Sequence, residues 1–148
     1  MDVISVLKSV ELFDGLLPDE LKAVAGISHE RTYQAGEVIT AQGDQGGDLH
    51  VVCSGFVEVL LSRPPAEPVP RTMVHLGRGQ IFGEMALVDH GPRSATVRAL
   101  TDNTVVQIVN REDFVRLCDG NHHMGYVVMR NMAADLSFKL RHRNLANR

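Results

Sequence analysis

Residues 79–97 read GQIFGEMALVDHGPRSATV, and this stretch decides the fold. A short apolar strand ends at Gly83, and one helical turn at residues 84–88 follows it. The chain breaks at residues 89–92 and resumes as a β-branched strand near Ser94. The stretch therefore predicts a strand, a glycine, a short helix and a second strand, packed into one compact loop.

The helical turn and the arginine behind it form a candidate anion site. The first turn of a helix has N–H groups without partners and a partial positive charge. Arg93 adds a planar fork of donors that suits two oxygens of one phosphate. Glu84 can accept hydrogen bonds from hydroxyls, which an anion-only site would not need. Singly, such a Glu is usually a helix cap and such an Arg a solvated loop residue, so the ordered pattern carries the prediction.

Outside this stretch the spacing of apolar residues changes twice. It is helical over residues 2–10 and 18–27, has a period of two from His29, and is helical again after Asn110. Turn signals rich in Gly, Asn and Asp separate the short β-rich runs. Eight short strands favour an antiparallel jelly roll, so we expect a mainly β fold with flanking helices. We expect the strands at residues 29–34, 38–42, 49–54, 56–62, 72–76, 80–82, 95–100 and 104–109, and the C-terminal helices at 111–118 and 122–142.

One proline-rich segment interrupts the pattern at residues 63–70, where four of eight residues are proline. Proline cannot continue a strand ladder, so we expect an exposed, extended loop. Such a segment can also be a ligand for aromatic grooves, but a surface loop is the interpretation we adopt. It is not a domain boundary, because strands of one roll are expected on both sides.

The composition is that of one globular domain. The chain has 148 residues, of which 44% are hydrophobic and 22% charged, so it can bury a core. The net charge of −3 gives no global attraction to nucleic acid. No apolar run reaches the length of a membrane span, and the N-terminus does not have the pattern of a signal peptide. We expect a cytoplasmic protein, or the cytoplasmic module of a larger one, without membrane insertion.

Residues that carry catalysis or bind metals form no recognisable constellation. Cys53 and Cys118 lie far apart in the sequence, and we expect both to be buried free thiols. Of the seven histidines only His122 and His123 are adjacent, which does not make a metal site on a helix. No nucleophile–base pair or Walker-type loop is apparent, so we expect neither an enzyme nor a metal site.

The long C-terminal helix is apolar over more of its surface than one contact requires. Asn121 is expected to cap it, and Gly120 to end the helix before it. The excess suggests a second partner, either a symmetry-related helix or a bound ligand. The alternative is that the helix only covers the roll. One apolar row holds Met124, Val128, Met132, Leu136 and Leu140, widened by Met129 and Ala133, and a second row holds Val127, Ala134 and Phe138.

The ordered pattern Phe-Gly-Glu-x-Ala-Leu … Pro-Arg-Ser-Ala-Thr-Val resembles the phosphate-binding cassette of the cyclic nucleotide-binding domain. That family serves catabolite activator proteins, regulatory subunits of cAMP-dependent protein kinase and cyclic-nucleotide-gated channels. The resemblance extends from Leu12 to about Leu140. It implies one domain over residues 1–148, with N-terminal helices at 1–28, a β-roll at 29–110 that contains the cassette at 82–95, and C-terminal helices at 111–142.

By position, the resemblance gives the cassette residues their roles. Arg93 would pair with the cyclic phosphate, and Ser94 would assist it through its N–H and hydroxyl. Backbone N–H groups near Met85 and Ala86 would add further donors. Glu84 would accept a hydrogen bond from the ribose 2′-hydroxyl. The implied ligand-binding residues are Phe82, Gly83, Glu84, Met85, Ala86, Arg93, Ser94 and Ala95.

The resemblance leaves the base open between cAMP and cGMP. Ser94 follows the pattern of bacterial cAMP regulators, which places cAMP ahead of cGMP. Those regulators contact adenine through a Thr-Ser pair on the long helix, where this chain has Lys139-Leu140. Candidate contacts to the base or across a dimer are Asn131, Asp135 and Lys139, although Asp135 and Lys139 can equally form an i,i+4 ion pair.

We therefore expect a cyclic mononucleotide sensor, a regulatory module that transmits occupancy through its C-terminal helix. The resemblance implies a homodimer through that helix, with cAMP or cGMP as ligand and no cofactor. Nothing in the chain resembles a helix-turn-helix domain, so no specific DNA binding is expected. The alternatives are an interaction scaffold of the same fold that no longer binds a nucleotide, and a binder of cyclic dinucleotides. The chain is either a stand-alone sensor or a module of a larger protein.

Overall fold

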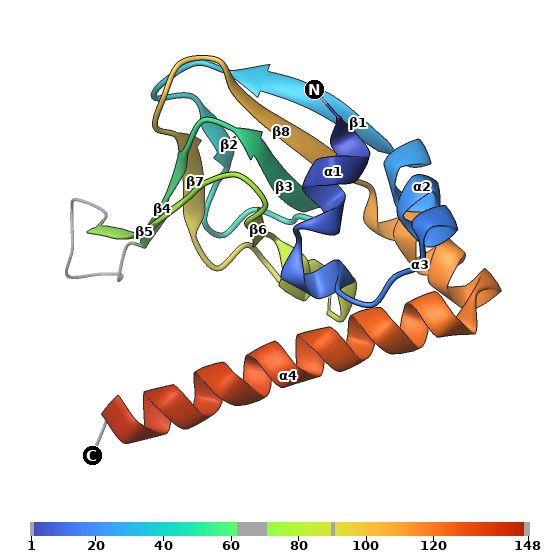
Figure 1. The fold of residues 1–148 in the computed structure, drawn as a ribbon. Helices are drawn as coiled ribbons and strands as arrows, with labels where there is room; N and C mark the ends of the chain where they lie inside the picture. The colour runs from blue at the N-terminus through green and yellow to red at the C-terminus, as the bar shows by residue number, and fades with distance from the viewer. Residues whose placement is uncertain (1, 62–70, 90, 147–148) are drawn as a thin grey trace.

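Two antiparallel sheets form the centre of the molecule in the computed structural model, which describes residues 2–61, 71–89 and 91–146 (Figure 1). Within those residues one sheet has the order β1-β8-β3-β6 and the other β2-β7-β4-β5. The expected eight-stranded antiparallel jelly roll is confirmed. Its strands are β1 (Ser28–Tyr33), β2 (Val38–Thr40), β3 (Leu49–Ser54), β4 (Val57–Leu61), β5 (Arg71–Leu76), β6 (Ile81–Phe82), β7 (Thr96–Ala99) and β8 (Thr104–Val109).

Helices precede and follow the roll, and one short turn interrupts it. Figure 1 shows α1, α2 and α3 grouped on one side of the roll, while α4 passes beneath it and ends on the opposite side. The helices are α1 (Val3–Lys8), α2 (Pro18–Gly26), α3 (Arg111–Gly120) and α4 (His122–Ala146), and the 3₁₀ turns are η1 (Glu11–Phe13) and η2 (Glu84–Leu87).

Asparagine side chains fix the starts of the two C-terminal helices. Asn110 Oδ1 accepts a hydrogen bond from Asp113 N–H (3.0 Å), and Asn121 Oδ1 accepts one from Met124 N–H (3.1 Å). The predicted cap at Asn121 is therefore confirmed. The helix before it was expected at residues 111–118 with Gly120 as its stop, and α3 runs two residues further, to end at Gly120. Asn121 follows in an extended conformation that leads directly into α4.

Two apolar cores hold the layers together. One lies inside the roll, between the two sheets, and includes Phe82 and Val52. The other lies between the helices and the outer face of the β1-β8-β3-β6 sheet, where Phe13, Phe114 and Val51 are buried. Because successive strand residues point to opposite faces, β3 contributes to both cores. The buried β3 also pairs with β6, whose last residue, Phe82, begins the cassette.

One face of α4 is buried along the first half of the helix, and the second half is largely exposed. Met124, Val128 and Met132 pack into the helical core. Leu136 is 36% exposed and Leu140 is 58% exposed. The apolar row predicted from the spacing is thus covered by the rest of the chain only as far as Met132.

Three further sequence predictions have different outcomes. Cys53 is a buried free thiol as expected, whereas Cys118 is free but only partly buried. The proline-rich segment at residues 63–70 lies outside the described residues. None of the helices in the described part of the chain has the length and apolar character needed to cross a membrane.

Candidate functional site

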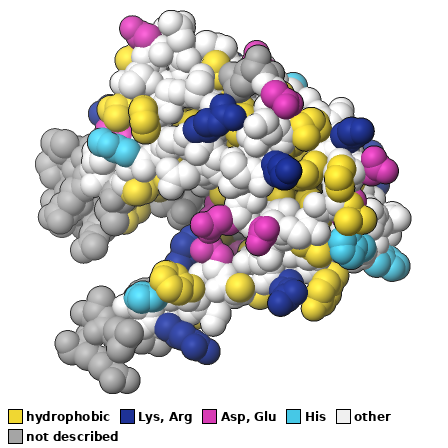
Figure 2. Space-filling view, in the orientation of Figure 1, with side chains coloured by type: hydrophobic (Ala, Val, Ile, Leu, Met, Phe, Trp, Pro, Cys, Tyr) yellow, Lys and Arg dark blue, Asp and Glu magenta, His cyan; other side chains and the backbone are white. Residues whose placement is uncertain are grey.

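One cavity of about 360 Å³ lies under η2, within the size range of small-molecule sites. Figure 2 shows the hollow between the roll and the distal half of α4, with acidic side chains gathered at its inner end. The structure brings all of the predicted ligand-binding residues to this cavity, and Lys139 reaches it from α4. The cassette residues that line it are Phe82, Gly83, Glu84, Met85, Ala86, Arg93, Ser94 and Ala95.

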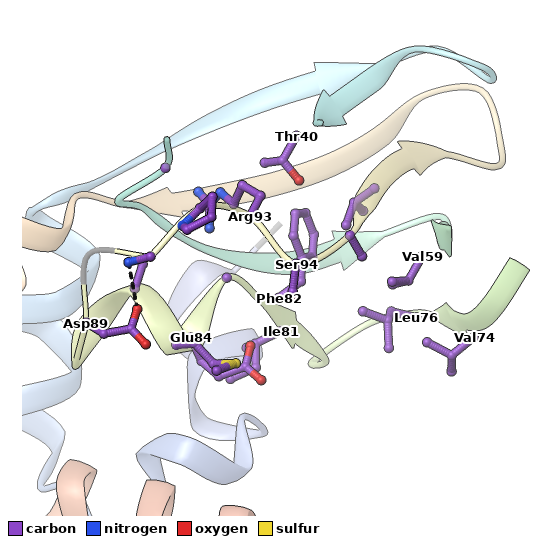
Figure 3. Close-up of a pocket in the computed structure, with 18 of the residues that line it drawn as sticks. Thr40, Val59, Val74, Leu76, Ile81, Phe82, Glu84, Asp89, Arg93 and Ser94 are labelled. Atoms are coloured by element: carbon purple, nitrogen blue, oxygen red, sulfur yellow. Dashed lines mark hydrogen bonds between the residues drawn. The ribbon is translucent and has the colours of Figure 1, made fainter. Parts of the chain in front are cut away.

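The cavity has charged groups at one end and an apolar wall at the other. In Figure 3, Arg93 lies on one side of the charged end and Glu84 on the other. The apolar wall is formed by Val59, Val74 and Leu76 from β4 and β5. This arrangement suits a ligand that carries an anionic group, a hydroxyl and a flat apolar part.

Arg93 is held by the loop between β2 and β3. Its Nη2 donates to the carbonyl oxygen of Asp48 (3.0 Å), and its backbone N–H donates to the carbonyl of Asp44 (2.8 Å). Burial lowers the pKa of Arg93 from its ordinary value, while the charge of Asp48 raises it. An arginine has so high an ordinary pKa that the side chain remains a cation at neutral pH. The site therefore keeps a fixed positive charge with donors available to a ligand.

Gly46 in the same loop makes room for this arginine. A Cβ atom at Gly46 would overlap the Nε and Cζ atoms of Arg93. Gly46 and Gly47 lie in one of the Gly-rich turns expected between strands, and the sequence prediction did not connect them with the site. The pair was the available clue, because a glycine is often needed where a backbone closely approaches a functional group.

Gly83 places the start of η2 against the arginine. Its φ of +83° lies in the left-handed region, and a Cβ there would lie 2.7 Å from the carbonyl oxygen of Asp48. The N–H of Ala86 donates to the carbonyl of Gly83 (3.2 Å). A 3₁₀ turn leaves the N–H groups before that bond without partners inside the helix. Glu84 and Met85 thus offer better backbone donors than Ala86, whose N–H is already engaged.

Glu84 faces a lysine from α4. Lys139 Nζ lies 3.8 Å from Glu84 Oε1 and 2.9 Å from Asp135 Oδ2. The hydrogen bond with Asp135 raises the pKa of Lys139, burial lowers it, and the charges of Asp135 and Glu84 raise it further. The predicted i,i+4 ion pair between Asp135 and Lys139 is therefore present, and it lies beside the cassette.

The three candidate base contacts on α4 have different environments. Lys139 lines the cavity, and Asp135 is its ion-pair partner. Asn131 instead donates its Nδ2 hydrogens to the carbonyls of Leu12 (2.9 Å) and Asp14 (2.8 Å). Asn131 thus ties α4 to the segment at η1, and it is not among the residues that line the cavity.

His50 packs behind the cavity, against Phe82. The two rings are stacked with centroids 4.6 Å apart and an interplanar angle of 8°. Burial, followed by the charge of Arg93, lowers the pKa of His50 to about 4, so the imidazole is neutral at neutral pH. The neutral imidazole therefore packs flat against the Phe82 ring, as an aromatic side chain would.

Arg111, the first residue of α3, connects the cassette to the C-terminal helices. Its Nε donates to the carbonyl of Ala86 (2.5 Å), and its N–H donates to Asp48 Oδ1 (3.4 Å). Sequence analysis missed this residue because nothing local marks a contact between the start of a helix and a turn 25 residues earlier. Among the described residues no three His, Cys, Asp or Glu side chains group as a metal site would require.

Comparison with known sequences identifies relatives along most of the chain. A sequence model described as the cyclic nucleotide-binding domain matches residues 30–121. A cyclic AMP receptor protein from Thermus thermophilus is 37% identical over 139 residues, which is 94% of this chain and 61% of that protein. A cGMP-dependent protein kinase from Drosophila melanogaster is 31% identical over 77% of this chain and 15% of its own length. The chain thus spans about three fifths or less of these relatives.

Solved structures show the same architecture. The catabolite activator protein of Thermus thermophilus is similar with a TM-score of 0.79 and 36% identity, over 92% of this chain and 61% of that one. The regulatory domain of Toxoplasma gondii PKA, crystallised with cAMP, is similar with a TM-score of 0.78 and 30% identity, over 91% of this chain and 48% of that one.

Proposed function

This chain belongs to the cyclic nucleotide-binding domain family, and we propose that it is a sensor that binds a cyclic mononucleotide as a regulatory module. One observation carries the proposal: the guanidinium of Arg93 and the carboxylate of Glu84 face each other across one cavity, which the predicted ligand-binding residues of the cassette line. A cyclic nucleotide offers an anion and a free 2′-hydroxyl on one sugar. An anion alone would be repelled by Glu84, so the pairing of charges favours a phosphorylated ribose.

The cyclic phosphate binds between Arg93 and the start of η2. The guanidinium presents parallel donors to two phosphate oxygens. The first N–H groups of η2 and the N–H and hydroxyl of Ser94 complete the cradle. The Asp48 carbonyl already binds the guanidinium, and Gly46 leaves the space that the arginine side chain fills. Arg93 therefore loses little side-chain freedom when the phosphate binds.

The ribose lies over Gly83, and its 2′-hydroxyl donates to Glu84. The base extends along the wall of Val59, Val74 and Leu76, with α4 on its open side. We place cAMP ahead of cGMP, since Ser94 follows the cAMP pattern and the first relative described above is a cyclic AMP receptor protein. Occupancy biases α4 only if the ligand binds two positions of that helix with different affinity.

α4 further supports a homodimer. Tyr126, Met129, Ala133, Leu136 and Leu140 recur at alternating spacings of three and four residues, and all five are exposed. This set, the α4 seam, has the spacing of a two-helix coiled coil. A second copy of the chain supplies an identical seam, so the proposed partner is another α4.

Titration calorimetry with cAMP and cGMP in parallel tests the sensor, with Arg93→Ala as the diagnostic variant. Removing a charge-assisted contact to phosphate is expected to raise the Kd by about 10- to 100-fold. Arg116→Ala is the matched control, because Arg116 is a highly exposed arginine of α3 whose ion pair is with Asp113. It should bind as the wild type does. No heat with either nucleotide, on folded protein, would favour the scaffold or the cyclic-dinucleotide alternative.

A further inference from the structure

We infer that Lys139 competes with the ribose 2′-hydroxyl for Glu84, so that α4 sets the affinity of the site for ribose-containing ligands. This inference rests on the proposed function. It concerns Lys139, which the sequence offered as a contact to the base, as a contact across a dimer or as the ion-pair partner of Asp135. The geometry gives Lys139 a further role, because its Nζ lies 3.8 Å from the carboxylate oxygen assigned to the sugar.

Three charged groups meet at this point. Lys139 Nζ lies 3.8 Å from Glu84 and 2.9 Å from Asp135, so Asp135 holds the ammonium more closely. The Lys139 side chain is 59% exposed, Glu84 23% and Asp135 45%. The ammonium is therefore able to move toward solvent while it keeps Asp135. Glu84, being more enclosed, has fewer positions in which to meet a second partner.

Competition follows from the shape of the cavity as well as from charge. Lys139 is the α4 residue that lines the cavity, opposite the cassette turn that carries Glu84. A sugar that places its 2′-hydroxyl on Glu84 enters the volume that the ammonium faces. The lysine must withdraw before that hydrogen bond forms, so part of the binding free energy is spent on separating the ion pair. Partly exposed ion pairs are weak, so the expected effect is about two- to fivefold in Kd.

The arrangement predicts opposite effects for two neighbouring substitutions. Lys139→Met removes the competitor and keeps most of the side-chain volume, so cAMP should bind about two- to fivefold more tightly. Asp135→Asn removes the closer carboxylate, so Lys139 pairs with Glu84 instead. The ribose then competes with a stronger ion pair, and cAMP should bind more weakly by a similar factor. The double variant should match Lys139→Met, because Asp135 acts only through the lysine. A base contact or a purely structural role would not produce this pattern of signs.

Calorimetry on the full chain with cAMP and with its 2′-deoxy analogue tests the inference. The 2′-deoxy analogue makes no bond to Glu84, so its Kd should be unchanged by Lys139→Met. The gain for cAMP should shrink as salt is raised from about 50 mM toward 1 M, since exposed ion pairs are screened. Weaker binding of both ligands by Lys139→Met would overturn the inference and make the lysine a base or phosphate contact. Unchanged binding of cAMP would also overturn it while leaving the sensor intact, whereas wild-type protein that binds no cyclic nucleotide would overturn both proposals.

Discussion

The position of the Arg93 side chain depends on two glycines, Gly46 and Gly83. The β2–β3 loop passes so close to the guanidinium that Gly46 leaves no space for a methyl group. The same arginine lies 2.5 Å (Nη1) from where a Cβ on Gly83 would be. Two glycines therefore determine where the site's positive charge is found, and neither of them offers a functional group to a ligand.

Gly46→Ala should consequently weaken binding although it removes no contact. The new Cβ displaces the Arg93 side chain, and we expect the Kd for the bound cyclic nucleotide to rise by about tenfold. Gly120→Ala is the matched control, because nothing lies within 4 Å of a Cβ there and the residue is helical. The control should bind normally and gain about 0.5–1 kcal/mol of stability. Calorimetry and thermal unfolding distinguish the two, and wild-type affinity in Gly46→Ala would contradict the role given to Gly46.

At the scale of elements, a buried carboxylate joins α2 to the start of α4. Glu20 accepts hydrogen bonds from Leu17 N–H (2.8 Å) and Asn121 Nδ2 (2.9 Å), and lies 3.0 Å from His123 Nδ1. Burial alone would raise the pKa of Glu20, but the hydrogen bonds from Leu17, His123 and Asn121 lower it below the ordinary 4.5. The N-terminal helices thus hold the point where α3 turns into α4.

The lowered pKa of Glu20 predicts a stability that depends on pH. A carboxylate whose folded pKa is depressed stabilises the fold above its unfolded value and ceases to do so as pH falls through the folded value. Glu20→Gln should cost about 1–3 kcal/mol at pH 7, and the difference from wild type should shrink below about pH 4.5. Urea unfolding at several pH values measures this, with Glu11→Gln at an exposed position as the control. If the difference in unfolding free energy between Glu20→Gln and wild type stays constant with pH, the charge of Glu20 does not contribute to stability.

The elements themselves were predictable where their signals are local. All eight strands lie within a few residues of their predicted positions, because alternating apolar residues and Gly-rich turns mark each strand separately. The failures concern contacts between distant segments. Nothing near Asn131 indicates that its amide binds the carbonyls of Leu12 and Asp14, and nothing near Arg111 indicates a bond to Ala86. Those contacts depend on how whole helices and strands pack against one another. The spacing of residues along the chain gives no information about that packing.

Across the whole molecule, the cavity is assembled from parts that lie far apart in the sequence. The cassette supplies the charges, β4 and β5 supply the apolar wall, and α4 supplies Lys139. A ligand held by all of them connects the roll to the helix that leaves it. Because α4 carries the exposed α4 seam, a change in the position of that helix also moves the surface that the seam offers to a second copy.

The α4 seam predicts that the protein is a dimer whose mass, by light scattering, is twice the chain mass of 16.3 kDa. Leu140→Glu places like charges opposite each other at the two-fold seam, where desolvation makes them costly, and should yield monomers at micromolar concentration. Phe138→Glu is the matched control, because Phe138 is also exposed on α4 but points about 160° away from Leu140 around the helix. It should remain dimeric. A wild-type mass equal to one chain would exclude the seam as a dimer interface, and a monomer produced equally by both variants would show that the helix associates through a different face.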